Sequence, residues 1–218
     1  MNVQIGKHVV GDEHGCFVSL EPSATYRNFD EAKSMIDAVS NSGAHAIKFQ
    51  TFLPGDVERI IEDRGIKVKF GTTKGEKQES VFDALKRREL EKKEWEDLVN
   101  YSKEKNLGFI TAPYFIETVD FVSKIRVDAL KISKGDINNV LLIDEVAKTK
   151  LPVILDARER LDEIDQAISQ ADLSDIESEI LEYIRYIGVF NELSLKKALS
   201  MPSKPPALYR LCKACEKI

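Results

Sequence analysis

One apolar stretch of the chain carries the side chains best suited to binding an anion. Lys48 and Gln50 lie among strand-forming residues in residues 43–51 (GAHAIKFQT), where Gly43 ends the preceding helical pattern. A lysine inside an apolar strand is costly unless its ammonium meets an anion. The stretch therefore predicts a buried strand that brings Lys48 and Gln50 to one rim of a sheet. The same residues also fit a lysine whose ammonium reaches solvent from the strand end.

The elements that would position this pair alternate along the chain through about residue 170. Short apolar runs predict strands, and amphipathic spacing predicts helices between them. The predicted strands are residues 16–21, 46–50, 108–112, 128–132 and 152–156, and the predicted helices are residues 30–40, 81–88, 92–105, 116–124, 141–149 and 160–170. This alternation predicts an α/β fold of parallel βα units. Since a closed barrel of this kind needs eight strands, we expect a partial (β/α) barrel-like sheet of about five.

Two regions depart from the alternation. Residues 3–5 and 8–10 flank Gly6 and Lys7, which predicts a small hairpin at the start of the chain. Residues 53–79 are polar and contain four glycines, which predicts a long loop.

The last part of the chain predicts an all-helical segment. Helical patterns cover residues 174–187, 195–200 and 206–217, and residues 191–218 carry six basic against two acidic side chains, a net charge of +4. The whole chain has a net charge of −5, so the remainder carries −9, and this asymmetry predicts two modules, residues 1–171 and 172–218. The helix order resembles half of a helix-turn-helix, which would bind DNA. The alternative is a helical cap over a sheet edge, or an interface helix.

The composition indicates a soluble globular protein. Of 218 residues, 43% are hydrophobic and 32% are charged, and no apolar run approaches the roughly 20 residues of a membrane span. The N-terminus lacks the basic-then-apolar pattern of a secretion signal, which predicts a cytoplasmic protein without membrane contact. Cys16, Cys212 and Cys215 make no disulfide framework, and a single CxxC pair argues against a zinc site.

Several motifs, taken in order, resemble the sialic acid (N-acetylneuraminate) synthase family, including its spore-coat polysaccharide relatives. They lie at residues 5–11 (IGKHVVG), 43–51 (GAHAIKFQT), 79–86 (ESVFDALK), 117–121 (ETVDF) and 130–139 (LKISKGDINN). The resemblance covers about residues 3–170. It implies a TIM barrel that condenses phosphoenolpyruvate with an N-acetylmannosamine-type amino sugar to give a nonulosonic acid.

The resemblance also implies a role for individual side chains. Lys48 would pair with the phosphate or carboxylate of phosphoenolpyruvate, Lys131 would be a second cation, and Gln50 would bond the sugar. Glu21, at the end of the first strand, would contact the sugar. Asp136 stands where the family has a glutamate near the reacting centre, one methylene shorter in reach.

Positions around the phosphate depart from the family pattern. Ala112 stands where the phosphate-binding threonine is expected, and strand alternation directs the neighbouring Thr111 to the opposite side. Lys134 replaces a serine and would bind an anion as a point charge. Asp156 replaces a serine and would place a carboxylate beside the phosphate. The predicted substrate-binding residues are Lys48, Gln50, Thr111, Lys131 and Lys134, with Glu21 and Asp136 as the catalytic pair.

Metal ligands are the largest departure. The family uses a divalent metal such as manganese, held by histidines on its late strands. This chain has only His8, His14 and His45, all before the second predicted strand ends, so the sequence assigns no metal ligand.

Two functions follow from these observations. The first is a synthase of this family, acting on phosphoenolpyruvate and an amino sugar. The second is a degenerate, non-catalytic relative that binds a sugar or phosphate or serves as a scaffold, with a DNA-binding tail as an option. In purely structural readings, Lys131 pairs with Asp136 or Glu21, and Lys134 is a surface charge. Five strands leave an open sheet edge, which predicts a homodimer or a partner chain.

Overall fold

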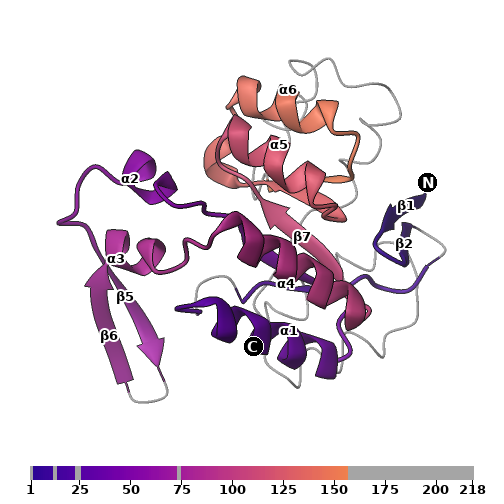
Figure 1. Ribbon diagram of the computed structural model, residues 1–218, viewed down its shortest axis with the longest axis horizontal. Helices are drawn as coiled ribbons and strands as arrows, with labels where there is room; N and C mark the ends of the chain where they lie inside the picture. The colour runs from indigo at the N-terminus through magenta and orange to yellow at the C-terminus, as the bar shows by residue number, and fades with distance from the viewer. Residues whose placement is uncertain (1, 12–13, 23–25, 73–74, 157–218) are drawn as a thin grey trace, which may run out of the picture.

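The computed structural model describes residues 2–11, 14–22, 26–72 and 75–156 (Figure 1). Its centre is a five-stranded parallel sheet in the order β3-β4-β7-β8-β9. The strands are β3 (Ser19–Leu20), β4 (Ala46–Gln50), β7 (Gly108–Ala112), β8 (Ala129–Ile132) and β9 (Val153–Leu155). The predicted α/β fold with five parallel strands is therefore confirmed, and the curled sheet forms half of a barrel.

Four amphipathic helices accompany the sheet, with α1 beside α4 and α5 beside α6 (Figure 1). They are α1 (Phe29–Asn41), α4 (Lys92–Glu104), α5 (Ile116–Lys124) and α6 (Val140–Lys148). Asn28 begins α1, because its side chain accepts a hydrogen bond from the Glu31 N–H. Ala32, Ile36 and Val39 recur at helical spacing and are buried, so α1 turns one apolar face to the core.

Both faces of the sheet are buried, as parallel sheets require. The larger core lies between the sheet and the helices and contains Phe49, Phe109 and Leu130. A smaller cluster on the inner face contains Val3, Ile5, Ala46, Ile110, Ala129 and Ile154. Two of its members belong to β1 (Asn2–Ile5), which pairs with β2 (His8–Gly11) in the predicted hairpin. The hairpin thus closes the inner face of the half-barrel.

The first strand of the sheet is shorter than predicted. Residues 16–21 were expected to be a strand, but only Ser19 and Leu20 pair with β4. The Val18 N–H donates to the imidazole of His45, and the Val18 carbonyl accepts the N–H of His45. A hydrogen bond to a side chain therefore replaces the next backbone hydrogen bond between β3 and β4, and the regular pairing of the two strands ends there.

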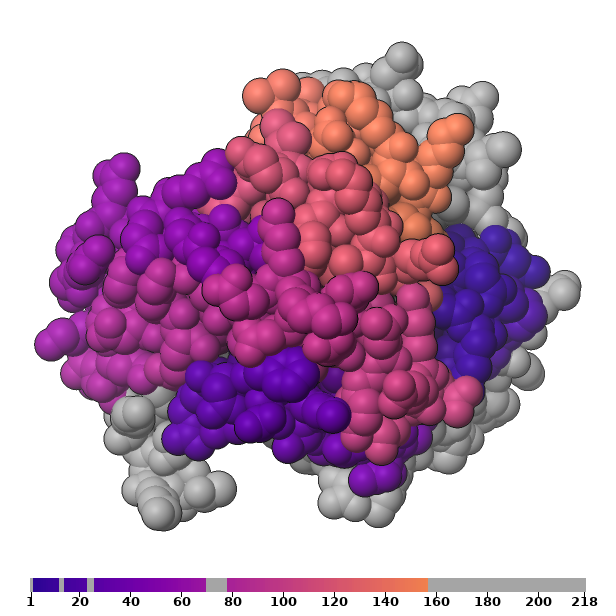
Figure 2. Space-filling model, in the orientation of Figure 1, coloured from indigo at the N-terminus to yellow at the C-terminus, as the bar shows by residue number. Residues whose placement is uncertain are grey.

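The prediction of a loop over residues 53–79 was wrong. This segment contains α2 (Asp56–Ile60) and a hairpin of β5 (Lys67–Thr72) with β6 (Gly75–Ser80), followed by α3 (Val81–Lys86). The two strands pair with each other in a sheet of their own and join no strand of the central sheet. Figure 2 shows the segment from α2 to α3 and the β1–β2 hairpin at opposite ends of one face of the molecule.

Several predictions concern residues 157–218, which lie outside the described part of the chain. They are the helices at residues 160–170, 174–187, 195–200 and 206–217, the boundary at residue 171, the DNA-binding tail and the Cys212–Cys215 pair. They stay predictions. Among the described residues, no helix has both the length and the apolar character needed to cross a membrane.

Candidate active site

Two lysines are buried on the inner face of the half-barrel. Lys48 is 1% exposed and Lys131 is 7% exposed. In the strand register, Lys48 lies opposite Ile110 and Lys131 lies opposite Ile154, and both of these isoleucines belong to the inner apolar cluster. Because side chains at matched positions of a parallel pair point to the same face, β4 and β8 bring both ammonium groups to one side of the sheet.

Each buried lysine is paired with a carboxylate that follows an edge strand. The Lys48 ammonium contacts Glu21, the residue directly after β3. The Lys131 Nζ lies 2.9 Å from Asp156 Oδ2, directly after β9. The partner of Lys131 is thus Asp156, in place of the Asp136 or Glu21 anticipated for a structural pair. Two cations and two carboxylates meet where the strands end.

Burial sets the protonation of this cluster. The pKa of Lys48 is lowered from 10.5 to about 8, chiefly by loss of hydration, and the charge of Lys131 contributes to this decrease. The carboxylates of Glu21 and Asp156 act in the opposite direction and keep the ammonium form favoured. Lys48 is therefore charged at neutral pH, and another anion close to it would favour the ammonium form further.

A second group of polar side chains lies beside these pairs. Gln50 Nε2 donates to the hydroxyl of Tyr114, with 2.7 Å between the two atoms. The charges of Asp136 and Glu21 both act on this phenol, so Tyr114 lies near both predicted catalytic carboxylates. Burial raises the pKa of Asp136, which a hydrogen bond from Asn139 partly offsets. Lys134, two residues before Asp136 in a short 3-10 helix, is exposed to solvent.

Tyr114 was not among the site residues predicted from the sequence. It follows Pro113 two residues after the end of β7, where a strand delivers side chains to the rim of the sheet. An aromatic hydroxyl at that position was the signal that could have identified it.

Thr111 faces away from the buried lysines. It lies opposite Phe49 and Leu130 in the register, and both belong to the core between the sheet and the helices. Its hydroxyl is 2.6 Å from the hydroxyl of Thr51, and both threonines are buried. Ala112, which ends β7, is also buried and offers no hydroxyl. The strand alternation anticipated for Thr111 is thus seen, and it leaves this residue outside the cluster.

The described residues do not fit the divalent metal that the family resemblance implies. Within them, no three or more histidine, cysteine, aspartate or glutamate side chains are grouped so as to hold a metal ion. The histidines His8, His14 and His45 instead line one pocket with Cys16. The chemistry proposed below therefore includes no step on a metal.

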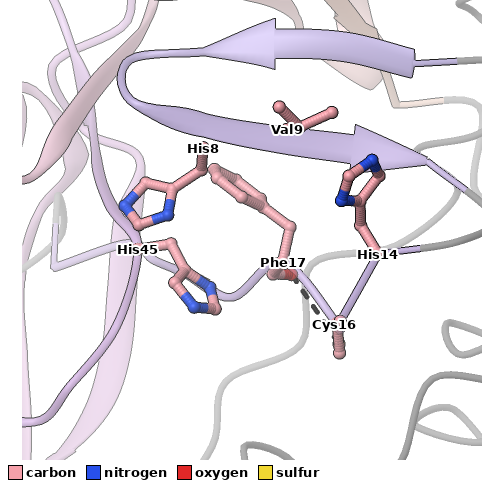
Figure 3. Close-up of a pocket in the computed structure, with 7 residues that line it drawn as sticks. His8, Val9, His14, Cys16, Phe17 and His45 are labelled. Atoms are coloured by element: carbon pink, nitrogen blue, oxygen red, sulfur yellow. Dashed lines mark hydrogen bonds between the residues drawn. The ribbon is translucent and has the colours of Figure 1, made fainter.

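That pocket lies at the amino end of β4, below the lysine cluster, and has a volume of about 250 Å³. His8 and His45 have ring centroids 4.7 Å apart, and Phe17 stacks on His45 at 5.6 Å (Figure 3). The Val18 N–H donates to His45 Nδ1 at 2.8 Å. Burial lowers the pKa of His45, and the nearby His8 lowers it further. A neutral His45 thus ties the residue before β3 to the residue before β4.

The chain is similar to an N,N'-diacetyllegionaminic acid synthase and to a spore coat polysaccharide biosynthesis protein. The N,N'-diacetyllegionaminic acid synthase of Campylobacter jejuni is 26% identical over 175 residues, which are 78% of this chain and 52% of that protein. The spore coat polysaccharide biosynthesis protein SpsE of Bacillus subtilis is 28% identical over 69% of this chain and 39% of its own length. The chain spans about half, or less, of the length of these relatives.

A solved structure shows the same fold. The N-acetylneuraminic acid synthetase of Leptospira borgpetersenii, determined in complex with citrate, superposes with a TM-score of 0.66 at 26% identity. The match covers 79% of this chain and 55% of that one. The family model of NeuB matches residues 35–182, which include β4, β7, β8 and β9 and the lysines that they carry. The chain belongs to the NeuB family.

Proposed function

We propose that this chain carries the phosphoenolpyruvate-binding half of a NeuB-type synthase site, which condenses phosphoenolpyruvate with an N-acetylmannosamine-type amino sugar to a nonulosonic acid. The observation that carries the proposal is the pair of buried lysines on the inner face of the sheet. Burial of an ammonium group costs several kcal/mol in lost hydration. A ligand that carries both a phosphate and a carboxylate can offset this cost with charge-assisted hydrogen bonds.

Each residue has a role in the proposed site. Lys48 and Lys131 neutralise the phosphate and carboxylate groups, and they exchange their present carboxylate partners for the substrate. Glu21 and Gln50 then face the sugar, because both lie at strand ends beside the lysines. Asp136 serves as the proton-transfer group. Burial raises the pKa of its carboxyl, so the carboxyl holds a proton more readily than it would in water at the same pH.

Phosphate release tests this proposal. The full chain would be incubated with phosphoenolpyruvate, N-acetylmannosamine and manganese, with inorganic phosphate measured over time. Lys48→Met keeps the side-chain volume but removes the charge, and it should lower kcat/KM at least about 100-fold, as expected when one partner of a buried charge pair is removed. Lys124→Ala is the matched control, because Lys124 pairs with Asp120 on the exposed surface of α5. Release that is absent in the wild type, or unchanged in Lys48→Met, would contradict the proposal.

A second candidate function is a non-catalytic relative that binds a sugar or phosphate. Asp156 favours this second candidate, because its carboxylate already pairs with the Lys131 ammonium at the position where a phosphate would bind. Ala112 adds to this, since it has no hydroxyl to bind phosphate. Phosphoenolpyruvate binding measured by calorimetry, without phosphate release in the same preparation, would favour this candidate over the synthase.

A further inference from the structure

Tyr114 holds a fixed position at the rim of the sheet. Its ring stacks on Phe52, with centroids 5.1 Å apart and planes inclined by 9°. Phe52 is 1% exposed and belongs to a small apolar cluster against which Tyr114 packs. The phenol oxygen is held in turn by Gln50, whose Nε2 donates to it at 2.7 Å. Both the ring and the hydroxyl therefore have one defined orientation.

The phenol oxygen acts as an acceptor in its bond with Gln50. A tyrosine hydroxyl can accept two hydrogen bonds and donate one. Gln50 Nε2 supplies one donor at 2.7 Å. Ser133 also hydrogen-bonds the phenol, and a serine hydroxyl can serve such a bond as donor or as acceptor. The O–H of Tyr114 can therefore turn to a bound molecule while Gln50 and Ser133 hold the phenol oxygen.

Charge decides which molecule this would be. Burial raises the pKa of the Tyr114 phenol, and the charges of Asp136 and Glu21 act in the same direction, so the hydroxyl stays protonated. The same carboxylates repel an anion from this corner of the site. The cations Lys48 and Lys131 lie at earlier positions of their strands than the rim residues Gln50 and Ser133. A neutral, oxygen-rich ligand therefore fits beside Tyr114, and an anion fits at the lysines.

We propose that the Tyr114 hydroxyl is a further substrate-binding residue that donates a hydrogen bond to an oxygen of the acceptor sugar, beside the amide of Gln50. This inference rests on the proposed function and adds to it the residue that helps to select the sugar. The required ligand chemistry is a hydroxyl or carbonyl oxygen within reach of the phenol. An acceptor that lacks an oxygen there would leave the phenol proton without a partner, and buried donors without partners discriminate strongly.

Steady-state kinetics with two substrates test the inference. Tyr114→Phe removes one oxygen and keeps the stack on Phe52. It should raise the KM for N-acetylmannosamine about tenfold, while the KM for phosphoenolpyruvate changes less than about twofold. Tyr101→Phe is the matched control, because the Tyr101 hydroxyl on α4 donates to Asp37 on α1, among the helices that cover the outside of the sheet. It should change neither constant.

The possible results separate the two proposals. A selective rise in the sugar KM, with an unchanged circular dichroism spectrum, supports the role of Tyr114. An unchanged sugar KM, or an equal rise in both KM values, overturns that role and leaves the proposed function intact. A wild-type protein that releases no phosphate overturns the proposed function, and the role of Tyr114 in sugar selection with it.

Discussion

Lys48 shows how one residue can combine a structural and a chemical requirement. Its ammonium is buried, so hydration is lost and the pKa decreases to about 8. Its pairing with Glu21 prevents a larger decrease. The charge is thus maintained by a neighbour that an anionic substrate can replace. Lys131 is likewise buried and paired with a carboxylate, with its Nζ 2.9 Å from Asp156 Oδ2.

The lowered pKa of Lys48 predicts how anion binding depends on pH. Only the ammonium form attracts phosphoenolpyruvate, so affinity should be highest below the pKa and decrease above it. With a pKa of about 8, the dissociation constant measured by calorimetry should rise about tenfold between about pH 7 and about pH 9. Lys48→Arg provides the comparison, because a guanidinium stays charged over this range. An equally steep pH dependence in Lys48→Arg would mean that another group is responsible.

Neighbouring residues of a strand point to opposite faces of the sheet, so they make different contacts and can have different functions. In β7, Ile110 faces the inner cluster, whereas Thr111 faces the helices and bonds with Thr51. The Thr111 hydroxyl also donates to the Phe49 carbonyl at 3.3 Å. A residue that was predicted to bind substrate thus has the contacts of a structural hydrogen bond between two strand ends.

Thr111→Val tests this assignment. Valine has nearly the same shape, but it leaves the buried Thr51 hydroxyl without this partner. The free energy of unfolding in urea should therefore decrease by about 1–3 kcal/mol, with the KM for phosphoenolpyruvate changed less than about twofold. The double variant Thr51→Val/Thr111→Val should recover part of the loss, because both polar groups are then removed. A large rise in the KM of a stable Thr111→Val protein would return Thr111 to the binding site.

Local patterns predicted those elements whose sequence and environment agree. The strand at Ala46–Gln50 and the helix at Ile116–Lys124 begin and end where apolar periodicity placed them. The hairpin of residues 67–80 was missed, because strands that pair only with each other show no apolar run. The sequence also predicted that Lys48 and Gln50 reach one rim of the sheet, and the family resemblance implied Lys131 as a second cation. The pairing of Lys131 with Asp156 could not be predicted, since it depends on how far the sheet curls.

At the scale of the whole molecule, the described sheet has two edges, β3 and β9. In the contact of β9 with β8, the Leu130 N–H donates to the Pro152 carbonyl and the Asp156 N–H donates to the Ile132 carbonyl. Ladder bonds of a parallel strand alternate in direction, so the N–H groups of Val153 and Leu155 point to the other side. Sheet edges of this kind readily pair with another chain.

We therefore predict that a second copy of the chain covers the β9 edge. Light scattering after size exclusion should give about twice the chain mass of 24.6 kDa, or about 49 kDa. Val153→Pro should shift the mass toward the monomer, because proline removes an N–H from the outer side of β9 and leaves the bonds of Pro152 and Asp156 with β8 in place. Val68→Thr is the control, because it changes an exposed residue of the separate β5–β6 hairpin and should leave the dimer unchanged. Val81→Pro would not serve as a control, since Val81 lies in α3. A folded wild-type monomer at micromolar concentration would contradict the prediction and leave the β9 edge to residues of the same chain.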